Sequence, residues 1–63
     1  MNRAEWQELC AKRLVARGGL DAGEAAATAI ILADTQEQQE GPHPVDWDEP
    51  DDAADEEMSC WGD

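Results

Sequence analysis

The stretch ARGGLDAGE, residues 16–24, decides how this chain folds, because it ends one helix and starts another within a few residues. Gly18 and Gly19 favour the end of a helix, since glycine adopts the left-handed conformation there without strain. Asp21 follows as an N-cap, with Glu24 at the capping-box position three residues later. So short a connection makes two helices antiparallel neighbours, and we therefore expect a helical hairpin.

Upstream of this stretch, residues 3 to about 17 contain no glycine or proline and predict the first helix. Asn2 can cap its N-terminus, and Glu5 completes an approximate capping box. The helical spacing of its apolar residues predicts a buried stripe of Trp6, Leu9, Cys10 and Leu14.

Downstream, residues 22 to about 39 predict a second, alanine-rich helix that ends before the sequence EGPHP. Alanine faces let two helices approach closely, which suits a hairpin. The predicted buried stripe of this helix is Ala22, Ala26, Ala29, Ile30 and Ala33, with Ile31 or Leu32 widening it.

The rest of the chain is different in character. Three prolines in GPHPVDWDEP, residues 41–50, exclude a regular helix there. Pro50 can occupy the first turn of a short third helix over about 50–60, with Ala54, Met58 and Trp61 as its apolar stripe. Pairs of like charges at i, i+4 spacing oppose this helix. We therefore expect an all-α fold, with a hairpin over residues 1–40 and a proline-containing acidic segment over 41–63 that packs on it or extends from it.

The charge of the chain is strongly negative and unevenly placed. Sixteen acidic residues against four basic ones give a net charge of −12, of which residues 41–63 contribute −9. Such a field repels nucleic acid and anionic membranes and attracts basic surfaces. The charge therefore argues against direct binding of nucleic acid or membranes and favours a basic protein as partner.

The small size of the chain limits its core. A chain of 63 residues buries only about 60% of the surface that its unfolded form exposes. Dimerisation, or docking on a partner, would bury more. Two cysteines, Cys10 and Cys60, are too few for a disulfide framework, and the N-terminal residues lack the apolar stretch of a signal peptide. We expect a cytoplasmic protein with reduced thiols.

The sequence predicts no catalytic residues, no cofactor and no specific metal site. Cys10 lies on the predicted buried stripe, where a cysteine acts as a small hydrophobic residue, and His43 lies between two prolines. The spacing of Asp46 and Asp48 suggests a calcium loop, but Pro50 stands where a third oxygen ligand belongs. We expect a protein that is not an enzyme.

The acidic segment instead predicts a protein-binding surface. Its tryptophans, Trp47 and Trp61, either fold back to complete the core or anchor an interface, where tryptophan is enriched. A fixed array of carboxylates can imitate the phosphates of duplex DNA, which carries one charge per roughly 1.7 Å of its axis. The candidate partner-binding residues are Asp46, Trp47, Asp48, Glu49, Asp51, Asp52, Asp55, Glu56, Glu57 and Trp61.

The acidic run DWDEPDDAADEE in so small a chain resembles the inhibitors that phages and other mobile elements encode against host nucleic-acid machinery, such as anti-CRISPR proteins and other DNA mimics. The resemblance implies an inhibitor in the host cytoplasm that binds a basic nucleic-acid-binding protein or complex. The alternative is a small phage-type structural, adaptor or assembly protein that dimerises through its hairpin. A DNA mimic needs its acids on a rigid surface, whereas the adaptor can use them as a flexible recognition peptide.

Overall fold

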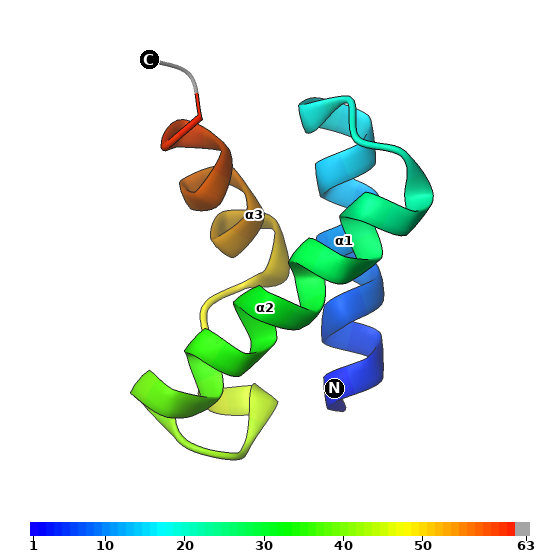
Figure 1. The fold of residues 1–63 in the computed structure, drawn as a ribbon. Helices are drawn as coiled ribbons and strands as arrows, with labels where there is room; N and C mark the ends of the chain where they lie inside the picture. The colour runs from blue at the N-terminus through cyan, green and yellow to red at the C-terminus, as the bar shows by residue number, and fades with distance from the viewer. Residues whose placement is uncertain (62–63) are drawn as a thin grey trace.

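The computed structural model describes residues 1–61, which form three α-helices and one short 3-10 helix. Helices α1 (Arg3–Gly18) and α2 (Ala22–Glu40) run antiparallel and are followed by the 3-10 helix η1 (Pro44–Asp46) and by α3 (Pro50–Ser59) (Figure 1). The all-α fold class is confirmed, together with the hairpin and the third helix over about 50–60.

The ends of the hairpin helices follow from local hydrogen bonds. The Asn2 side chain accepts a hydrogen bond from the Glu5 backbone N–H at 2.8 Å, and the Glu5 carboxylate accepts one from the Asn2 N–H. Gly19 ends α1 with φ of 72°, a left-handed conformation that favours glycine. The Asp21 carboxylate then caps α2 by accepting from the Glu24 N–H at 2.8 Å. These caps confirm the predicted ends.

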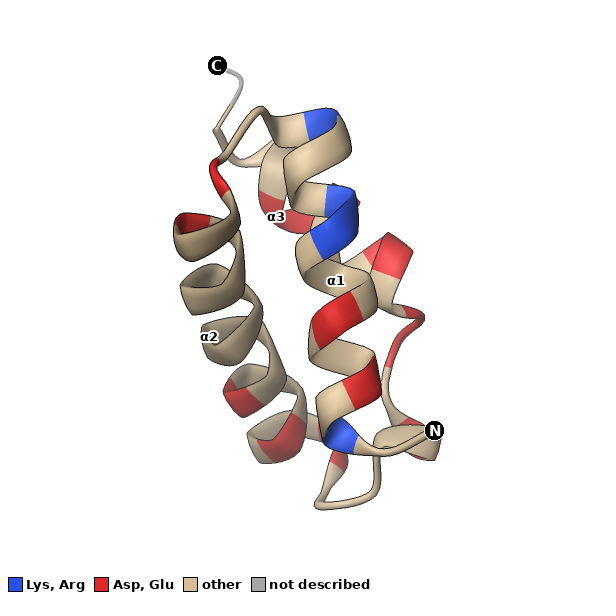
Figure 2. Cartoon of the chain, turned by 90° about the vertical axis from the view of Figure 1, so that its right-hand side faces the viewer, with Lys and Arg blue, Asp and Glu red and all other residues tan. Residues whose placement is uncertain are grey.

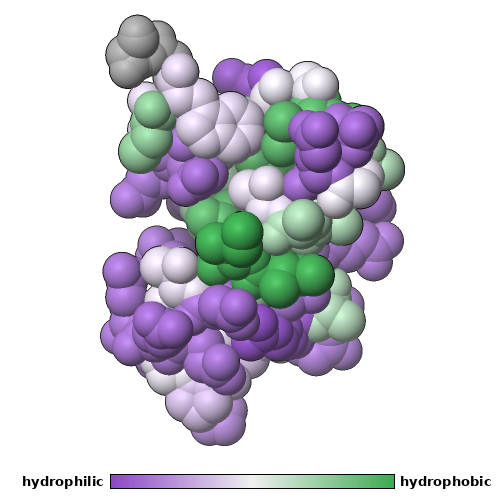
Figure 3. Space-filling model, in the orientation of Figure 1, coloured by the Kyte–Doolittle hydropathy of each residue, from purple (hydrophilic) through white to green (hydrophobic). Residues whose placement is uncertain are grey.

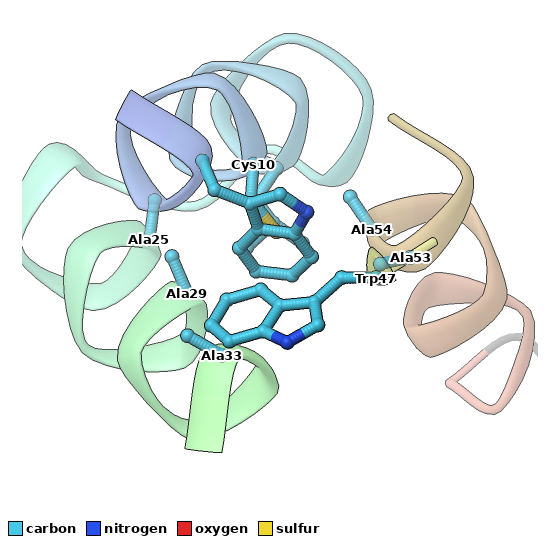
Figure 4. Packing of buried hydrophobic residues seen from close by; sticks show 9 residues of the cluster. Cys10, Ala25, Ala29, Ala33, Trp47, Ala53 and Ala54 are labelled. Carbon is cyan, nitrogen blue, oxygen red and sulfur yellow. The ribbon is translucent and has the colours of Figure 1, made fainter. Parts of the chain in front are cut away.

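Helix α1 is central to the packing, because both α2 and α3 lie against it while α2 and α3 touch each other little. The buried core consists of Trp6, Cys10 and Leu14 from α1, Ala25, Ala29 and Ala33 from α2, Ala53 and Ala54 from α3, and Trp47 from the connection. Alanines of α2 and of α3 lie on opposite sides of the tryptophans in Figure 4. Small residues on both flanking helices therefore make room for two large indoles.

The two indoles form the centre of this core. The rings of Trp6 and Trp47 lie 5.2 Å apart between centroids and are nearly perpendicular, at 88°. This edge-to-face arrangement directs the positive edge of one ring at the negative face of the other. Each indole N–H donates to a backbone carbonyl, that of Trp6 to Asp48 at 2.9 Å and that of Trp47 to Gly41 at 2.8 Å. Both aromatic side chains are therefore buried without an unsatisfied donor.

The predicted buried stripes were partly wrong. On α1, Trp6, Cys10 and Leu14 are buried as expected, but Leu9 is 39% exposed. On α2, Ala29 and Ala33 are buried, whereas Ile30 is 47% exposed. Two other predicted members of that stripe, Ala22 and Ala26, are also exposed. The buried face is instead Ala25, Ala29, Ala33 and Gln36.

The physical reason for the difference is the size of the tryptophans. A hydrophobicity pattern favours the face of α2 that contains isoleucine. The indole pair, however, needs a shallow surface, and the alanines at i, i+4 and i+8 provide it. Helix α2 is thus rotated so that its two isoleucines lie outside the core, while Leu32 packs partly against it. No helix within residues 1–61 is long and apolar enough to cross a membrane.

Candidate functional site

The connection between α2 and α3 is held against the hairpin by Asp48. Its backbone carbonyl accepts the Trp6 indole hydrogen bond, and its backbone N–H donates to the Gln36 side-chain oxygen at 3.1 Å. The amide nitrogen of Gln36, which is a buried residue, donates back to the Asp48 carboxylate at 3.3 Å. These bonds tie Asp48 to both hairpin helices and so fix the point from which α3 starts.

Helix α3 is oriented by its own small residues. Pro50 begins the helix, where its missing N–H costs nothing, and Asp51 and Asp52 follow in the first turn, where the helix dipole favours acids. Pro50, Ala53 and Ala54 are buried against the rest of the molecule. Because the buried residues lie on one side of α3, Asp51, Asp52 and Glu56 are turned outward.

An ion pair adds a second link between α3 and α1. The Arg13 guanidinium donates two hydrogen bonds to the Asp55 carboxylate, at 3.0 and 2.9 Å. These hydrogen bonds hold the pKa of the Asp55 carboxyl below its ordinary value of 3.8 and raise the pKa of Arg13. A planar, two-pronged contact of this kind has a defined direction as well as charge. It therefore fixes how α3 lies along α1.

The exposed carboxylates of this region form the candidate site, which we call the acidic face. Its members are Asp46, Asp48, Glu49, Asp51, Asp52 and Glu56. They come from η1, from the connection and from α3, whose positions are set by the contacts above. The acidic face thus belongs to the packed part of the molecule rather than to an extended tail.

Four of the predicted partner-binding residues lie outside the acidic face. Trp47 is only 7% exposed and stacks on Trp6, so its prediction as a surface anchor is corrected: it completes the core. Asp55 is already paired with Arg13, and Glu57 is half-buried. Trp61, at 43% exposed, is the one tryptophan with a large accessible surface.

Trp61 packs over the end of α1. A Cβ atom placed on Gly18 would lie 3.1 Å from the Trp61 ring and 3.0 Å from the Met58 sulfur, so a larger residue there would push these side chains back by a few tenths of an ångström. The Trp61 indole N–H donates to Glu57 at 3.3 Å. The ring therefore has one packed side and one exposed side, directly after the acidic residues of α3.

The basic residues are confined to one helix. Arg3, Lys12, Arg13 and Arg17 all belong to α1, as the blue segments of Figure 2 show. Arg3 pairs with Asp34 and Glu37, Lys12 with Glu8, and Arg13 with Asp55. Within residues 1–61, none of the carboxylates of the acidic face takes part in these ion pairs, so the face keeps its negative charge.

A groove between α1 and α2 was not predicted from the sequence. It has a volume of about 520 Å³ and is lined by Ala4, Ala11 and Val15 of α1 and by Ala22, Ala26 and Ile30 of α2. We call it the hairpin groove. The signal for it was present, because these α2 residues belong to the stripe predicted to be buried. They face away from the tryptophan core and leave an open apolar surface.

The chemistry of the remaining candidates is limited. Within residues 1–61, no group of three His, Cys, Asp or Glu side chains is placed to hold a metal ion. Cys10 is fully buried, and burial together with the charges of Asp51 and Glu57 raises the pKa of its thiol to about 11. Its reactive thiolate form is therefore scarce at neutral pH.

Comparison of the chain with models of protein families, with curated proteins and with solved structures finds no match.

Proposed function

We propose that this protein is a non-enzymatic inhibitor that binds the basic, nucleic-acid-binding surface of a host protein or complex. The acidic face would take the place of nucleic-acid phosphates in that surface. The observation that carries the proposal is that the acidic segment packs on the hairpin through Trp47, Pro50, Ala53 and Ala54, while the six carboxylates of the acidic face stay exposed. Such an inhibitor would act in the cytoplasm of the host cell.

The fixed position of the carboxylates supports this function over a flexible recognition peptide. Asp48 is bound to Gln36 and Trp6, and α3 is bound to α1 through Arg13 and Asp55. Charges that are already held in place need less ordering when a partner binds. The adaptor alternative, in which residues 41–63 act as a flexible tail, receives less support from the described part of that segment.

The charge balance supports a basic partner. The acidic face contains six exposed carboxylates, and three of the four basic residues are already paired with acids. Long-range attraction would speed the approach of a basic surface. Trp61 could then bury its exposed side in the partner, since tryptophan is enriched among the residues that dominate binding energy.

The proposal can be tested with two variants of equal charge. The first changes Asp51 and Asp52 to Asn and Glu56 to Gln on the acidic face. The matched control changes three exposed acids of α2, Glu24, Glu37 and Glu40, to Gln. Each variant is immobilised and offered a heparin-enriched fraction of nucleic-acid-binding proteins freed of nucleic acid. Proteins retained by the wild type are then assayed for binding to labelled duplex DNA in its presence.

We expect the wild type to retain a basic protein and to compete with its DNA. Three exposed charge pairs of about 0.2–1 kcal/mol each predict that the acidic-face variant binds about 3- to 150-fold more weakly. The control should bind nearly as well as the wild type. Binding should also weaken as salt is raised, because exposed charges are screened. Equal losses in the two variants, or retention without competition for DNA, would contradict the proposal.

A further inference from the structure

The hairpin groove lies on the side of the hairpin away from α3. Its lining comes from α1 and α2 alone, whereas α3 contacts α1 through Arg13 and Gly18, which are outside the groove. Two large aliphatic side chains that line it are exposed: Val15 is 43% exposed and Ile30 47%. Figure 3 shows hydrophobic surface over the middle of α2. This face of the hairpin has no intramolecular partner within residues 1–61.

We propose that a second copy of this chain occupies the hairpin groove, giving a two-fold symmetric pair of hairpins. In this pair, α1 lies antiparallel to α1 of the second copy. The inference goes beyond the proposed function and does not depend on it, since it concerns another face of the molecule.

The composition of the core argues for a second copy. Of the nine buried hydrophobic residues, five are alanines, and Leu14 is the only large aliphatic side chain among them. A domain of this size is only marginally stable, and association is one of the usual ways to bury more apolar surface. A standard interface needs about 800 Å² per partner, roughly a fifth of the 3988 Å² that this chain exposes. Two helices of 16 and 19 residues offer a face of about 24–28 Å in length for it.

The charges around the groove also favour a second copy. Among residues 1–61, the charged residues that line it are Glu8 and Lys12, so this lining is neutral although the chain has a net charge of −12. Two copies that meet there keep their acidic faces outside the interface, because α3 lies on another side of α1. The hairpin groove is therefore a surface through which two such acidic chains can approach with little local repulsion.

The register of the pair follows from the spacing along α1. In an antiparallel pair of identical helices centred on Cys10, Glu8 faces Lys12 of the second copy, and Lys12 faces its Glu8. The same register places Ala4 opposite Ala16 of the second copy at both ends, and both alanines line the groove. Small residues at the ends allow close approach, and opposite charges meet in the middle. A two-fold interface needs this kind of self-complementary pattern.

Charge exchange between copies provides a direct test. In a dimer of the Glu8→Lys variant, the lysines at positions 8 and 12 of one copy face lysines at positions 12 and 8 of the other. In a dimer of the Lys12→Glu variant, glutamates face glutamates at the same positions. Both side chains are largely exposed, at 68% and 70%, so the folded monomer should tolerate either change. Self-association is measured by sedimentation equilibrium from about 1 µM to 1 mM, with circular dichroism to confirm helix content.

We expect the wild type to dimerise within this range. The dimer dissociation constant of each single variant should be at least about tenfold higher than that of the wild type. An equimolar mixture of the two variants should form heterodimers, because each lysine then faces a glutamate. A wild type that remains monomeric to about 1 mM would overturn the proposal. A mixture that associates no better than the separate variants would also overturn the proposal, because the proposed register requires the two variants to restore each other's charge pairs.

Blocking the groove gives a second test that does not involve the charged pair. Ala26→Arg fills the groove, whereas Ala27→Arg places the same side chain on an exposed neighbouring position that does not line it. We expect the first variant alone to be monomeric at concentrations where the wild type and the control are dimeric. Equal dimerisation of the two arginine variants would overturn the assignment of the interface to the groove.

Discussion

Replacing Trp47 with alanine is the most direct test of how the acidic segment is held. The side chain is 7% exposed, its ring meets Trp6 edge to face, and its N–H donates to Gly41. The substitution would remove all three interactions and open a cavity between the connection and α1. We expect the acidic segment to lose its attachment to the hairpin.

The size of the effect follows from these contacts. Truncating a buried tryptophan to alanine costs about 3–5 kcal/mol in other proteins. A chain of 63 residues has about 3–9 kcal/mol of stability in total. Trp47→Ala should therefore lose at least about a third of this stability, and at the lower end of the range the protein would unfold without denaturant. Trp47→Phe should be milder, because it keeps an aromatic ring and loses the hydrogen bond to Gly41, which is worth about 0.5–1.5 kcal/mol.

The matched control is Trp61→Ala, the same chemical change at a side chain that is 43% exposed. Its partial burial over Gly18 predicts a loss of only about 1–2 kcal/mol. Urea unfolding followed by circular dichroism would compare the variants. If Trp61→Ala lowers the free energy of unfolding as much as Trp47→Ala does, the assignment of Trp47 to the core is refuted.

Three further predictions concern single residues. Alkylation at pH 8 should modify the exposed Cys60 rapidly and Cys10 only on unfolding, as mass spectrometry would show, and equal rates would contradict the burial of Cys10. Because the folded-state pKa of Asp55 is lowered, its ion pair stabilises the protein above the ordinary pKa of 3.8. The stability gap between wild type and Asp55→Asn should therefore close as pH falls from about 5 to about 2, and urea titrations that show a constant gap would contradict this. Gln36→Ala should cost about 1–3 kcal/mol in thermal or urea unfolding because it leaves the Asp48 N–H without its acceptor, whereas the exposed Gln38→Ala should cost little.

The helix ends could be predicted from sequence because each depends on residues that are close together in the sequence. The bonds that cap α1 and α2 join Asn2 to Glu5 and Asp21 to Glu24, three residues apart in each case. The buried face of α2 could not be predicted in the same way. It depends on Trp47, which follows Ala33 by fourteen residues and lies beyond about two further turns of α2 and a proline-rich connection.

The acidic face could also be predicted only where residues within one helix determine it. The outward position of Asp51, Asp52 and Glu56 follows from Pro50, Ala53 and Ala54 as the buried side of α3, which is a pattern within one helix. The pairing of Asp55 with Arg13 joins residues 42 positions apart, and no local pattern indicates it. The role of Gln36 was also missed, because a polar side chain is expected on the surface unless its partner is known.

The packing of α3 on α1 has a consequence for the order of events during protein synthesis. The Trp6 indole bonds to Asp48, 42 residues later, so in a nascent chain that has emerged only as far as α2 this tryptophan can be covered only on the side of α2. The native core must wait until the residues around Trp47 and α3 have been made, and closing so long a segment slows folding relative to a hairpin alone. Messages cut short before this region would yield a helical fragment with an exposed tryptophan, a substrate for chaperones and proteases rather than a working protein.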